Sequence, residues 1–469
     1  MGQKNKPVPV IAIFDVGKTN KKLFLFDEQY QIVFERTARF TETVDEDGDP
    51  CENLESLRLS IFDSLREVFK KEEFEVKSIN FTTYGASLVY LDKDGQPLGP
   101  LYNYLKPYPE ELKRQFYAKY GGEEAFSNTT ASPVLGSLNS GLQLYRMKHE
   151  KPELFKQIKY ALHLPQYLSY LISGALYADL TSIGCHTALW NFKTQDYHEW
   201  VKAEGILDKL APIATSDHVM PAAFPGNNYA VGIGFHDSSA ALIPYLINFQ
   251  EPFILLSTGT WCISLNPFNS TPLTVEELKN DCLCYLQFEG KPVKASRVFA
   301  GYEHEQQVKR IAAHFGGDVI SYRNAVFDPG IIELLRKNGK RGQEPGPKPG
   351  SETIKESLFS KRNLSDYATD IIAYHQLMQD LVDQQCQATQ RVLEGTKVKR
   401  IFVDGGFSKN AIFMNLLSAA FPELEVFAAS MAQATAVGAA LAIHKSWNTK
   451  PLPNDIIQLK FYSAAQHHY

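Results

Sequence analysis

The chain opens with apolar runs whose spacing predicts three β-strands. Residues 8–17 (VPVIAIFDVG) are almost continuously apolar, and residues 21–28 (KKLFLFDE) place Leu23 and Leu25 on one face and Phe24 and Phe26 on the other. Such runs are typical of strands that are buried on both faces. Residues 31–40 (QIVFERTARF) predict a third strand, so the start of the chain is interpreted as strand, short turn, strand, strand.

The rest of the first half alternates helical and strand patterns. Residues 52–72 predict a helix, because their apolar positions repeat at helical spacing. The members of this stripe are Leu54, Leu57, Ile61, Leu65 and Val68. Residues 76–85 predict another buried strand, and helices are expected at 141–158 and 164–174 within a Tyr-rich, irregular region that spans residues 100–220. A Gly-rich stretch at 229–247 changes to a helical pattern after Asp237.

The second half repeats this order of elements without repeating the sequence. Residues 251–267 again predict strand, small-residue turn and strand, with Thr258, Gly259 and Thr260 at the turn. Further elements are expected as a helix at 365–395, a strand at 398–406 with a helix after it, a strand at 423–429 and a helix at 433–445. The pattern predicts two similar α/β domains, residues 1–245 and 246–469, joined near residues 235–250 and separated by a cleft. Residues 338–352 are expected to form an exposed loop.

Composition narrows the class of protein. The 469 residues are 44% hydrophobic and 22% charged, with a net charge of −5, as in ordinary globular proteins. The sequence has no basic block that would predict a nucleic-acid partner, and none of its apolar stretches is long enough to predict a membrane span. The first ten residues lack the apolar core of a signal peptide, and the six cysteines suggest neither a disulfide framework nor a zinc site. We therefore expect a cytoplasmic protein.

The turn after the first strand contains Gly17, Lys18 and Thr19, which resemble the end of a P-loop. A P-loop also needs a glycine five positions earlier, where this chain has Ala12, and it leads into a helix rather than a strand. The turn is better explained as a hairpin whose backbone N–H groups can bind phosphate oxygens, with an ordinary hairpin as the alternative. Two such turns, one in each half, suit a nucleotide polyphosphate bound between the domains.

Five stretches, taken in order, resemble the FGGY carbohydrate kinases, a family with the actin-like, ribonuclease-H-like ATPase fold. They are FDVGKTNKK, GIGFHDSSAA, LSTGTWCIS, IFVDGGFSKNAIFMNLLSAAF and QATAVGAALAI. The resemblance covers nearly the whole chain. It implies a sugar bound in the first domain and MgATP between the domains. It also implies that Asp237 is the general base that takes the proton of the sugar hydroxyl during phosphoryl transfer. Taken alone, an Asp that opens a helix is more often an N-cap.

The resemblance also implies the other site residues. Asp15 and Asp237 are expected to hold Mg²⁺, with Asp15 binding through water. The expected nucleotide-binding residues are Gly17, Lys18, Thr19, Asn20, Thr258, Gly259, Thr260, Gly301, Gln306, Gly405, Gly406 and Asn410. The expected substrate-binding residues are Tyr84, Gly85, Ala86, Tyr104, His236, Asp237 and Ser238.

The identity of the sugar is the least determined part. The sequence lacks the Gln-Met-His-Gly strand and the Trp-x-Asp-x-Arg pattern of many members, and has Tyr84-Gly85-Ala86 and Tyr102-Asn103-Tyr104 instead. With His236-Asp237-Ser238, this resembles the rhamnulokinase and fuculokinase branch. That branch implies phosphorylation of O1 of a 6-deoxyketose such as L-rhamnulose or L-fuculose, whose apolar carbon suits a Tyr face. Xylulose, ribulose, another ketose or a polyol remains an alternative, as does a kinase of another family on this fold. A non-catalytic ATP-binding sensor also remains open, and so does a homodimer.

Overall fold

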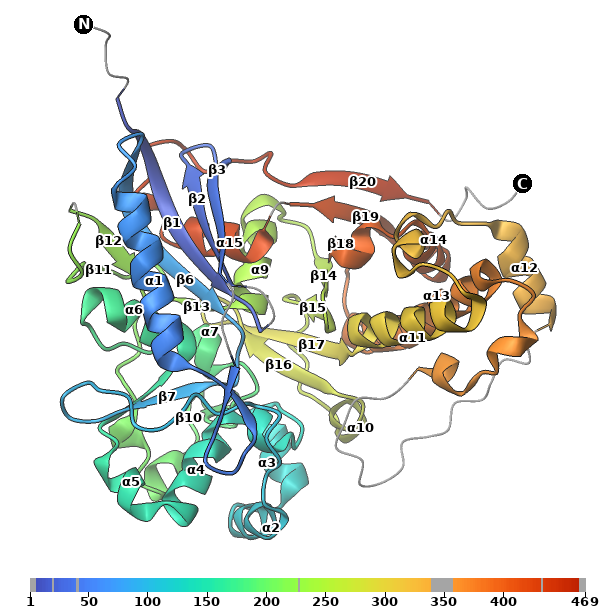
Figure 1. Ribbon diagram of the computed structural model, residues 1–469. Coiled ribbons are helices and arrows are strands. Elements are labelled where there is room, and N and C mark those ends of the chain that lie inside the picture. The colour runs from blue at the N-terminus through green and yellow to red at the C-terminus, as the bar shows by residue number, and fades with distance from the viewer. Residues whose placement is uncertain are drawn as a thin grey trace, which may run out of the picture.

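The structure is a computed structural model that describes residues 6–18, 21–38, 42–226, 228–338, 357–431 and 433–463. These residues form two seven-stranded sheets, which lie at the left and right of Figure 1 and are flanked by helices. The predicted α/β class is confirmed. The exposed loop expected at 338–352 lies outside the described residues, apart from its first position.

The first sheet contains the strands predicted at the start of the chain. Its order is β11-β12-β6-β1-β2-β3, with β13 also paired to β6. β1, β2 and β3 are antiparallel neighbours, whereas β6 runs parallel to β1, β12 and β13. The strand bounds are β1 Val8–Val16, β2 Lys21–Asp27, β3 Ile32–Ala38, β6 Phe74–Thr83, β11 Val219–Pro221, β12 Ala230–Gly232 and β13 Phe235–His236.

Both faces of this sheet are covered, which explains the continuous apolar runs. Alternate residues of β1 pack in two different clusters, because successive side chains of a strand point to opposite faces. One cluster includes the predicted stripe of helix α1 (Leu54–Phe69), which Asn53 caps by accepting a hydrogen bond from the Ser56 N–H. The other cluster joins Ile11 and Ile13 to helices α9 (Asp237–Asn248) and α15 (Ala434–Ala442).

The part of the sequence between β6 and β12 forms a mostly helical lobe, which lies below the first sheet in Figure 1. Its main elements are β7 Leu88–Leu91, α2 Glu110–Lys119, α3 Glu123–Thr130, α4 Ser140–Glu150, α5 Pro152–Gln157, β8 Tyr160–His163, α6 Leu164–Ser173, α7 Leu180–Ile183 and α8 Glu199–Ala203. The single helix predicted at 141–158 was wrong. Pro152 starts a new helix there, because proline has no N–H for a continuing helix and fits the first helical turn.

The sequence patterns also missed short strands. β4 (Glu42–Val44) and β5 (Pro50–Glu52) form a hairpin between β3 and α1, and β9 (Trp190–Asn191) pairs with β10 (Asp196–Tyr197). Strands of two or three residues are too short to show a period. The β4–β5 hairpin matters because it brings Glu52 to the region of the first turn.

The second sheet repeats the arrangement of the first. Its order is β16-β17-β15-β14-β18-β19-β20, in which β15 and β14 are antiparallel while β14, β18 and β19 are parallel. This matches the antiparallel β2 and β1 followed by the parallel β6 and β12, so the predicted repeat of pattern is confirmed. The bounds are β14 Phe253–Thr258, β15 Cys262–Asn266, β16 Cys282–Leu286, β17 Pro292–Val298, β18 Arg400–Gly405, β19 Glu425–Ser430 and β20 Gln458–Tyr462.

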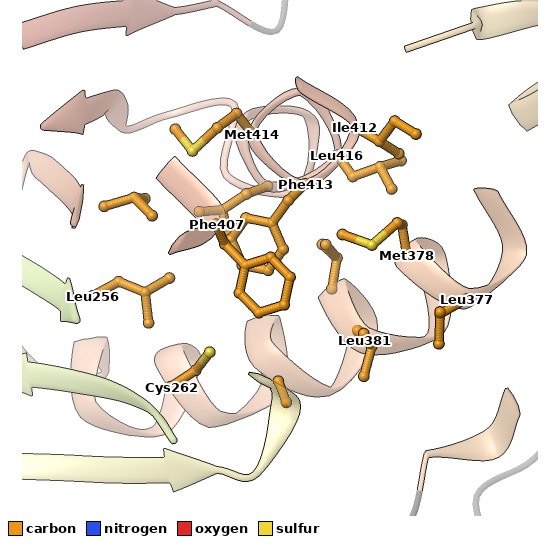
Figure 2. Close-up of a cluster of buried hydrophobic side chains, with 14 of the residues drawn as sticks. Leu256, Cys262, Leu377, Met378, Leu381, Phe407, Ile412, Phe413, Met414 and Leu416 are labelled. Carbon is orange, nitrogen blue, oxygen red and sulfur yellow. The ribbon is translucent and has the colours of Figure 1, made fainter. Parts of the chain in front are cut away.

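The core of the second half lies between this sheet and three helices. Figure 2 shows Met378 and Leu381 of α13 (Asp370–Leu393) and Phe413 of α14 (Ala411–Ala420) gathered beside Leu256 of β14. Helix α11 (Ala300–Phe315) packs in the same cluster. The shorter helices are α10 Val275–Lys279 and α12 Pro329–Asn338. Helix α13 begins five residues later than predicted, where Thr369 caps it by accepting a hydrogen bond from Ile372 N–H.

The two halves are joined by helix packing as well as by sequence. Helix α9 crosses the division expected after residue 245, and α15 packs on the first sheet although it belongs to the second range of the sequence. Gly438 of α15 lies so close to α9 that a Cβ there would be 1.9 Å from the Ala240 oxygen. Within the described part of the chain, no helix is both long and apolar enough to cross a membrane.

Candidate active site

Asp15 and Asp237 lie at the same edge of the first sheet. β1 and β13 are both parallel to β6, where Asp15 is opposite Thr82 and His236 is opposite Thr83. The carboxyl ends of parallel strands are where α/β proteins place their ligands. The charge of Asp237 contributes to raising the pKa of Asp15, so the two carboxylates are close enough to interact.

Asp237 is the first residue of helix α9 and follows directly on strand β13. Its Oδ1 accepts hydrogen bonds from the Ser238 N–H at 2.6 Å and the Ser238 hydroxyl at 3.3 Å. Although 31% of its side chain is exposed, protein surrounds the carboxylate, and this burial raises its pKa to about 6. A carboxylate that is partly accessible and has a raised pKa suits a general base near neutral pH.

His236 is a buried, neutral neighbour of Asp237. Burial lowers the pKa of its ring to about 3. Its Nδ1 is 3.3 Å from the Ser239 hydroxyl, which donates to the Leu286 oxygen at 3.0 Å. Its Nε2 lies 3.1 Å from Cys185 Sγ and 3.2 Å from Asp237 Oδ1. His236 thus orients its surroundings without adding positive charge.

Asp15 is held by a residue from the far end of the sequence. The Thr435 hydroxyl of α15 donates to Asp15 Oδ2 at 2.8 Å. Burial raises the pKa of Asp15 to about 6, and this hydrogen bond opposes the rise. Two carboxylates at one edge of the sheet suit Mg²⁺, which prefers carboxylate and water oxygens. The residues present therefore fit the expected metal.

The first turn carries Gly17 and Lys18, and the expected Thr19 and Asn20 lie outside the described residues. Lys18 Nζ lies over the rings of Tyr84 and Tyr104, at 5.3 and 5.6 Å from their centroids. It is also 3.6 Å from Glu52 Oε1. Lys18 therefore joins the first turn to two of the expected sugar-binding residues, while its ammonium group stays partly exposed.

In the second turn, residues 258–260, Thr258 was expected to bind the nucleotide, but its side chain has partners within the fold. The Thr258 hydroxyl donates to the Asp404 oxygen at 2.5 Å and accepts from the Phe407 N–H at 3.0 Å. It therefore ties β14 to the end of β18 and has no proton left for a phosphate. Gly259 and Thr260 are exposed, so they remain available at the surface of the turn.

Two of the expected nucleotide-binding glycines have packing roles. A Cβ at Gly301 would lie 1.8 Å from the Gly259 oxygen, and a Cβ at Gly405 would lie 1.9 Å from the Thr258 oxygen. Gly405 also has φ +88°, which glycine adopts most easily. Gly406 differs, because nothing lies within 4 Å of its missing Cβ. Of the two glycines at the end of β18, Gly406 is therefore the one with open space beside its Cα.

Asn410 also has partners within the fold. Its Oδ1 accepts from the Phe413 N–H at 3.0 Å as the N-cap of α14, and its Nδ2 donates to the Tyr374 hydroxyl at 2.8 Å. Gln306 is half-buried on α11. A nucleotide contact by Asn410 would have to share atoms that already make hydrogen bonds.

The expected substrate residues gather around the turn after β6. A Cβ at Gly85 would lie 2.6 Å from Cys185 Sγ and 3.1 Å from the His236 ring, so this glycine lets the turn approach His236, the neighbour of Asp237. Tyr84 and Tyr104 lie edge to face at 6.0 Å. Ala86 has φ +59°, and its oxygen accepts from Gln143 Nε2.

Tyr102 does not join Tyr104. The Tyr102 hydroxyl donates to Glu46, and Tyr102 lines a small cavity of about 30 Å³ with Lys106 and Arg146. Neither Asp15 nor Asp237 lines that cavity. The two tyrosines therefore belong to different sites, although a single residue separates them in the sequence.

Sequence reasoning missed Glu52 and Thr435. Glu52 lies in a strand of three residues, next to Lys18 and Lys21. No local pattern marks it. Thr435 left a faint signal, since it is a hydroxyl residue in the first turn of an otherwise apolar helix.

Comparison with known proteins agrees with this architecture. Residues 10–236 match the N-terminal domain of the FGGY family of carbohydrate kinases, residues 371–447 match its C-terminal domain, and residues 250–332 match a second model of the C-terminal domain of carbohydrate kinase FGGY. In solved structures, the fold is similar to a carbohydrate kinase from Novosphingobium aromaticivorans (TM-score 0.76, 21% identity, 97% of this chain and 94% of that one). It is also similar to a ligand-bound xylulose kinase from Lactobacillus acidophilus (TM-score 0.77, 16% identity, 98% and 95%).

Among curated proteins, the chain is similar to rhamnulokinases. It is 26% identical to that of Mannheimia succiniciproducens over 284 residues, which cover 57% of this chain and 55% of the relative. It is 27% identical to that of Klebsiella pneumoniae over 283 residues, covering 56% and 54%. The chain thus matches about half the length of these relatives. Together with the matches in both halves, these findings confirm the predicted family, and the chain belongs to the FGGY family of carbohydrate kinases.

Proposed function

We propose that this protein is an ATP-dependent sugar kinase that transfers the γ-phosphate of MgATP to a hydroxyl of a ketose. The observation that carries the proposal is the pair Asp15 and Asp237 at one edge of the first sheet, with Lys18 and two tyrosines beside them. Family membership supports the class of reaction.

Asp237 serves as the general base in this proposal. It takes the proton of the sugar hydroxyl as that oxygen forms its bond to the γ-phosphorus, and ADP leaves with the electrons of the broken P–O bond. Ser238 N–H and hydroxyl fix the orientation of the carboxylate. Burial raises its pKa to about 6, which makes it a stronger base than an ordinary aspartate.

Asp15 and Asp237 would hold Mg²⁺, which supplies charge neutralisation for the phosphates when bound. Lys18, Gly17, Thr19 and Asn20 are proposed to face the transferred phosphate. On the other side, Gly259, Thr260 and Gly406 are proposed to lie against the nucleotide, with Gln306 near the base. Thr258, Gly301, Gly405 and Asn410 act here by shaping the turns, because their side chains or missing Cβ atoms are already used in packing.

The proposed sugar is a 6-deoxyketose phosphorylated at O1, such as L-rhamnulose or L-fuculose. The rhamnulokinases among the relatives favour it. Tyr84 and Tyr104 offer faces for the apolar carbon. His236 and the turn at Gly85 complete the pocket. Xylulose is the second candidate, favoured by the xylulose kinase among the structural neighbours.

We further propose that residues 1–245 bind the sugar and residues 246–469 the nucleotide. A cytoplasmic location is proposed as well, and it is supported by six cysteines that are all free thiols.

The test is an ADP-release assay with purified protein, MgATP and a panel of L-rhamnulose, L-fuculose, D- and L-xylulose, L-ribulose, D-fructose and glycerol. Turnover with one 6-deoxyketose well above the others is the expected result. Turnover with a pentulose alone would keep the kinase mechanism and reject the 6-deoxyketose. ATP binding without sugar-dependent ADP release from any member would contradict the kinase proposal and favour a sensor.

A further inference from the structure

Glu52 is a buried carboxylate whose oxygens make no hydrogen bond of ordinary geometry with the described residues, although the Tyr84 hydroxyl lies near it. It ends β5 immediately before Asn53, the N-cap of α1, and its side chain is only 6% exposed. Both of its oxygens are buried. They lie 3.6 Å from Lys18 Nζ and 3.2 Å from Lys21 Nζ, so the two ammonium groups balance the charge of the carboxylate.

Other buried carboxylates of this protein are satisfied. Glu204 accepts from Lys119, Lys148 and Tyr120, and Asp380 receives two hydrogen bonds from the Arg362 guanidinium. A buried acceptor without a hydrogen bond destabilises the fold, because the acceptor has lost its water molecules without gaining another partner. A buried acceptor without such a bond therefore calls for a partner, such as a water molecule, an ion or a ligand.

The surroundings of Glu52 are those of the proposed sugar site. Its backbone forms a β-bridge with Leu101, just before the segment that carries Tyr104. Lys18, one of its partners, lies over the Tyr84 and Tyr104 rings. After burial, the negative charge of Glu52 is the next cause that raises the pKa of Tyr84. Burial also raises the pKa of Tyr104 to about 12, with contributions from the charges of both Asp237 and Glu52. One aromatic residue thus lies near both the base and the unsatisfied acid.

We infer that Glu52 binds the sugar by accepting hydrogen bonds from one or two hydroxyl groups that are not phosphorylated. A carboxylate can only accept, so the ligand must present hydroxyl donors at that end. Glu52 would then determine specificity, because a sugar that lacks the contacted hydroxyl leaves the buried carboxylate unpaired. The inference rests on the proposed sugar kinase function and adds a residue outside all five stretches that indicated the family.

The first experiment compares Glu52→Gln with the wild-type protein in the ADP-release assay and in calorimetric titration with sugar alone. We expect the sugar KM and Kd to rise about 10- to 100-fold, as for the loss of a hydrogen bond to a charged group. The Kd for a non-hydrolysable ATP analogue should stay within about twofold of the wild-type value. Glu42→Gln is the matched control, because Glu42 is exposed on the same hairpin and is the cross-strand partner of Glu52.

The second experiment uses single-deoxy analogues of whichever ketose the wild-type protein phosphorylates. One analogue should lose about 100-fold or more in kcat/KM with the wild-type protein, and Glu52→Gln should add little further loss for that analogue. If Glu52→Gln does not fold, Glu52→Asp and the analogue series with the wild-type protein give the same comparison.

Two results would overturn the inference while leaving the kinase function intact. One is an active Glu52→Gln protein with unchanged sugar KM and Kd. The other is a change in nucleotide affinity alone, which would make Glu52 only a counter-ion for Lys18. A wild-type protein that phosphorylates no sugar would instead reject the proposed function, and the role of Glu52 with it.

Discussion

The Thr435 hydroxyl donates to Asp15 Oδ2 at 2.8 Å across 420 positions of sequence. This bond links the first turn of α15 to the end of β1, at the edge where Asp237 also lies. The proposed metal site therefore depends on a helix from the end of the described chain.

Thr435→Val should weaken the binding of Mg²⁺. The substitution keeps the shape of the side chain but removes the hydrogen bond that holds Asp15 ionised. Outer partners of metal ligands of this kind contribute about 10-fold to metal affinity, so the half-saturating Mg²⁺ concentration should rise by about that factor. Thr435→Ser keeps the hydroxyl and should behave as wild type. An unchanged Mg²⁺ dependence in Thr435→Val would argue against Asp15 as a metal residue.

Asp237→Asn should abolish turnover while leaving nucleotide binding nearly normal. The amide keeps the size of the side chain but cannot accept the proton of the sugar hydroxyl. Loss of a general base lowers kcat by about 10²- to 10⁴-fold. Steady-state kinetics and titration with an ATP analogue measure the two effects separately, and Asp217→Asn at an exposed position serves as the control. Retention of most activity by Asp237→Asn would show that another group is the base.

Activity should fall as the pH decreases through about 6. Asp237 must be ionised to act as a base, and burial raises its pKa to about 6, so kcat/KM for the sugar should be level above this pH and fall below it. His236 should not contribute, because burial lowers its pKa to about 3. Asp15 also has a pKa of about 6, but the part of the profile that it causes should shift when Mg²⁺ is increased. A profile that stays level down to pH 4.5 would contradict the raised pKa of Asp237.

Gly405→Ala and Gly406→Ala should separate packing from nucleotide binding. Gly405→Ala should destabilise the protein, because its φ is +88° and the new Cβ would be 1.9 Å from the Thr258 oxygen. Strain at such positions costs about 1–3 kcal/mol, and the clash with backbone adds to it. Gly406→Ala has open space and should fold with a normal Tm, yet it should weaken ATP-analogue binding if the nucleotide approaches the backbone there. Normal nucleotide affinity in a folded Gly406→Ala protein would remove Gly406 from the proposed site.

Glu204→Gln should destabilise the protein without involving the active site. The buried Glu204 carboxylate accepts from Lys119, Lys148 and Tyr120. Breaking this network should cost about 2 kcal/mol in the free energy of unfolding, less than for a fully buried pair, since both lysines are partly exposed. Chemical denaturation at pH 7 measures the difference.

The stability difference between the wild type and Glu204→Gln should depend on pH. Hydrogen bonds from Lys119 and Lys148 outweigh the opposing effect of burial and lower the pKa of Glu204 to about 2, below the ordinary value of 4.5. A lowered pKa stabilises the folded state above the ordinary value, and this contribution is lost as the pH falls from about 4.5 towards 2. The wild type and Glu204→Gln should therefore become similar in stability near pH 2. A difference that persists unchanged at low pH would mean that packing, and not charge, accounts for the effect.

The sequence alone was sufficient for the strand pair that begins each half and for the repeated order of the elements that follow it. The runs at 8–17 and 21–28 are β1 and β2, the stripe from Leu54 to Val68 is the buried face of α1, and the two halves share one strand arrangement. These features depend on the spacing of apolar side chains along a helix or strand, which is a local property. The helix at 141–158 was predicted incorrectly because its apolar spacing continues past Pro152, where the missing N–H separates two helices.

Only the tertiary structure decided which polar groups meet. Glu52 reaches Lys18 through a hairpin too short to have a period, and Thr435 reaches Asp15 through the packing of α15 on the first sheet. Tyr102 and Tyr104 have different surroundings, and Asn103 between them forms a turn by accepting hydrogen bonds from the Leu105 and Lys106 N–H groups. A local pattern records which face of an element is apolar. The partner of a polar side chain depends on how distant elements pack, and that information is spread over the whole chain.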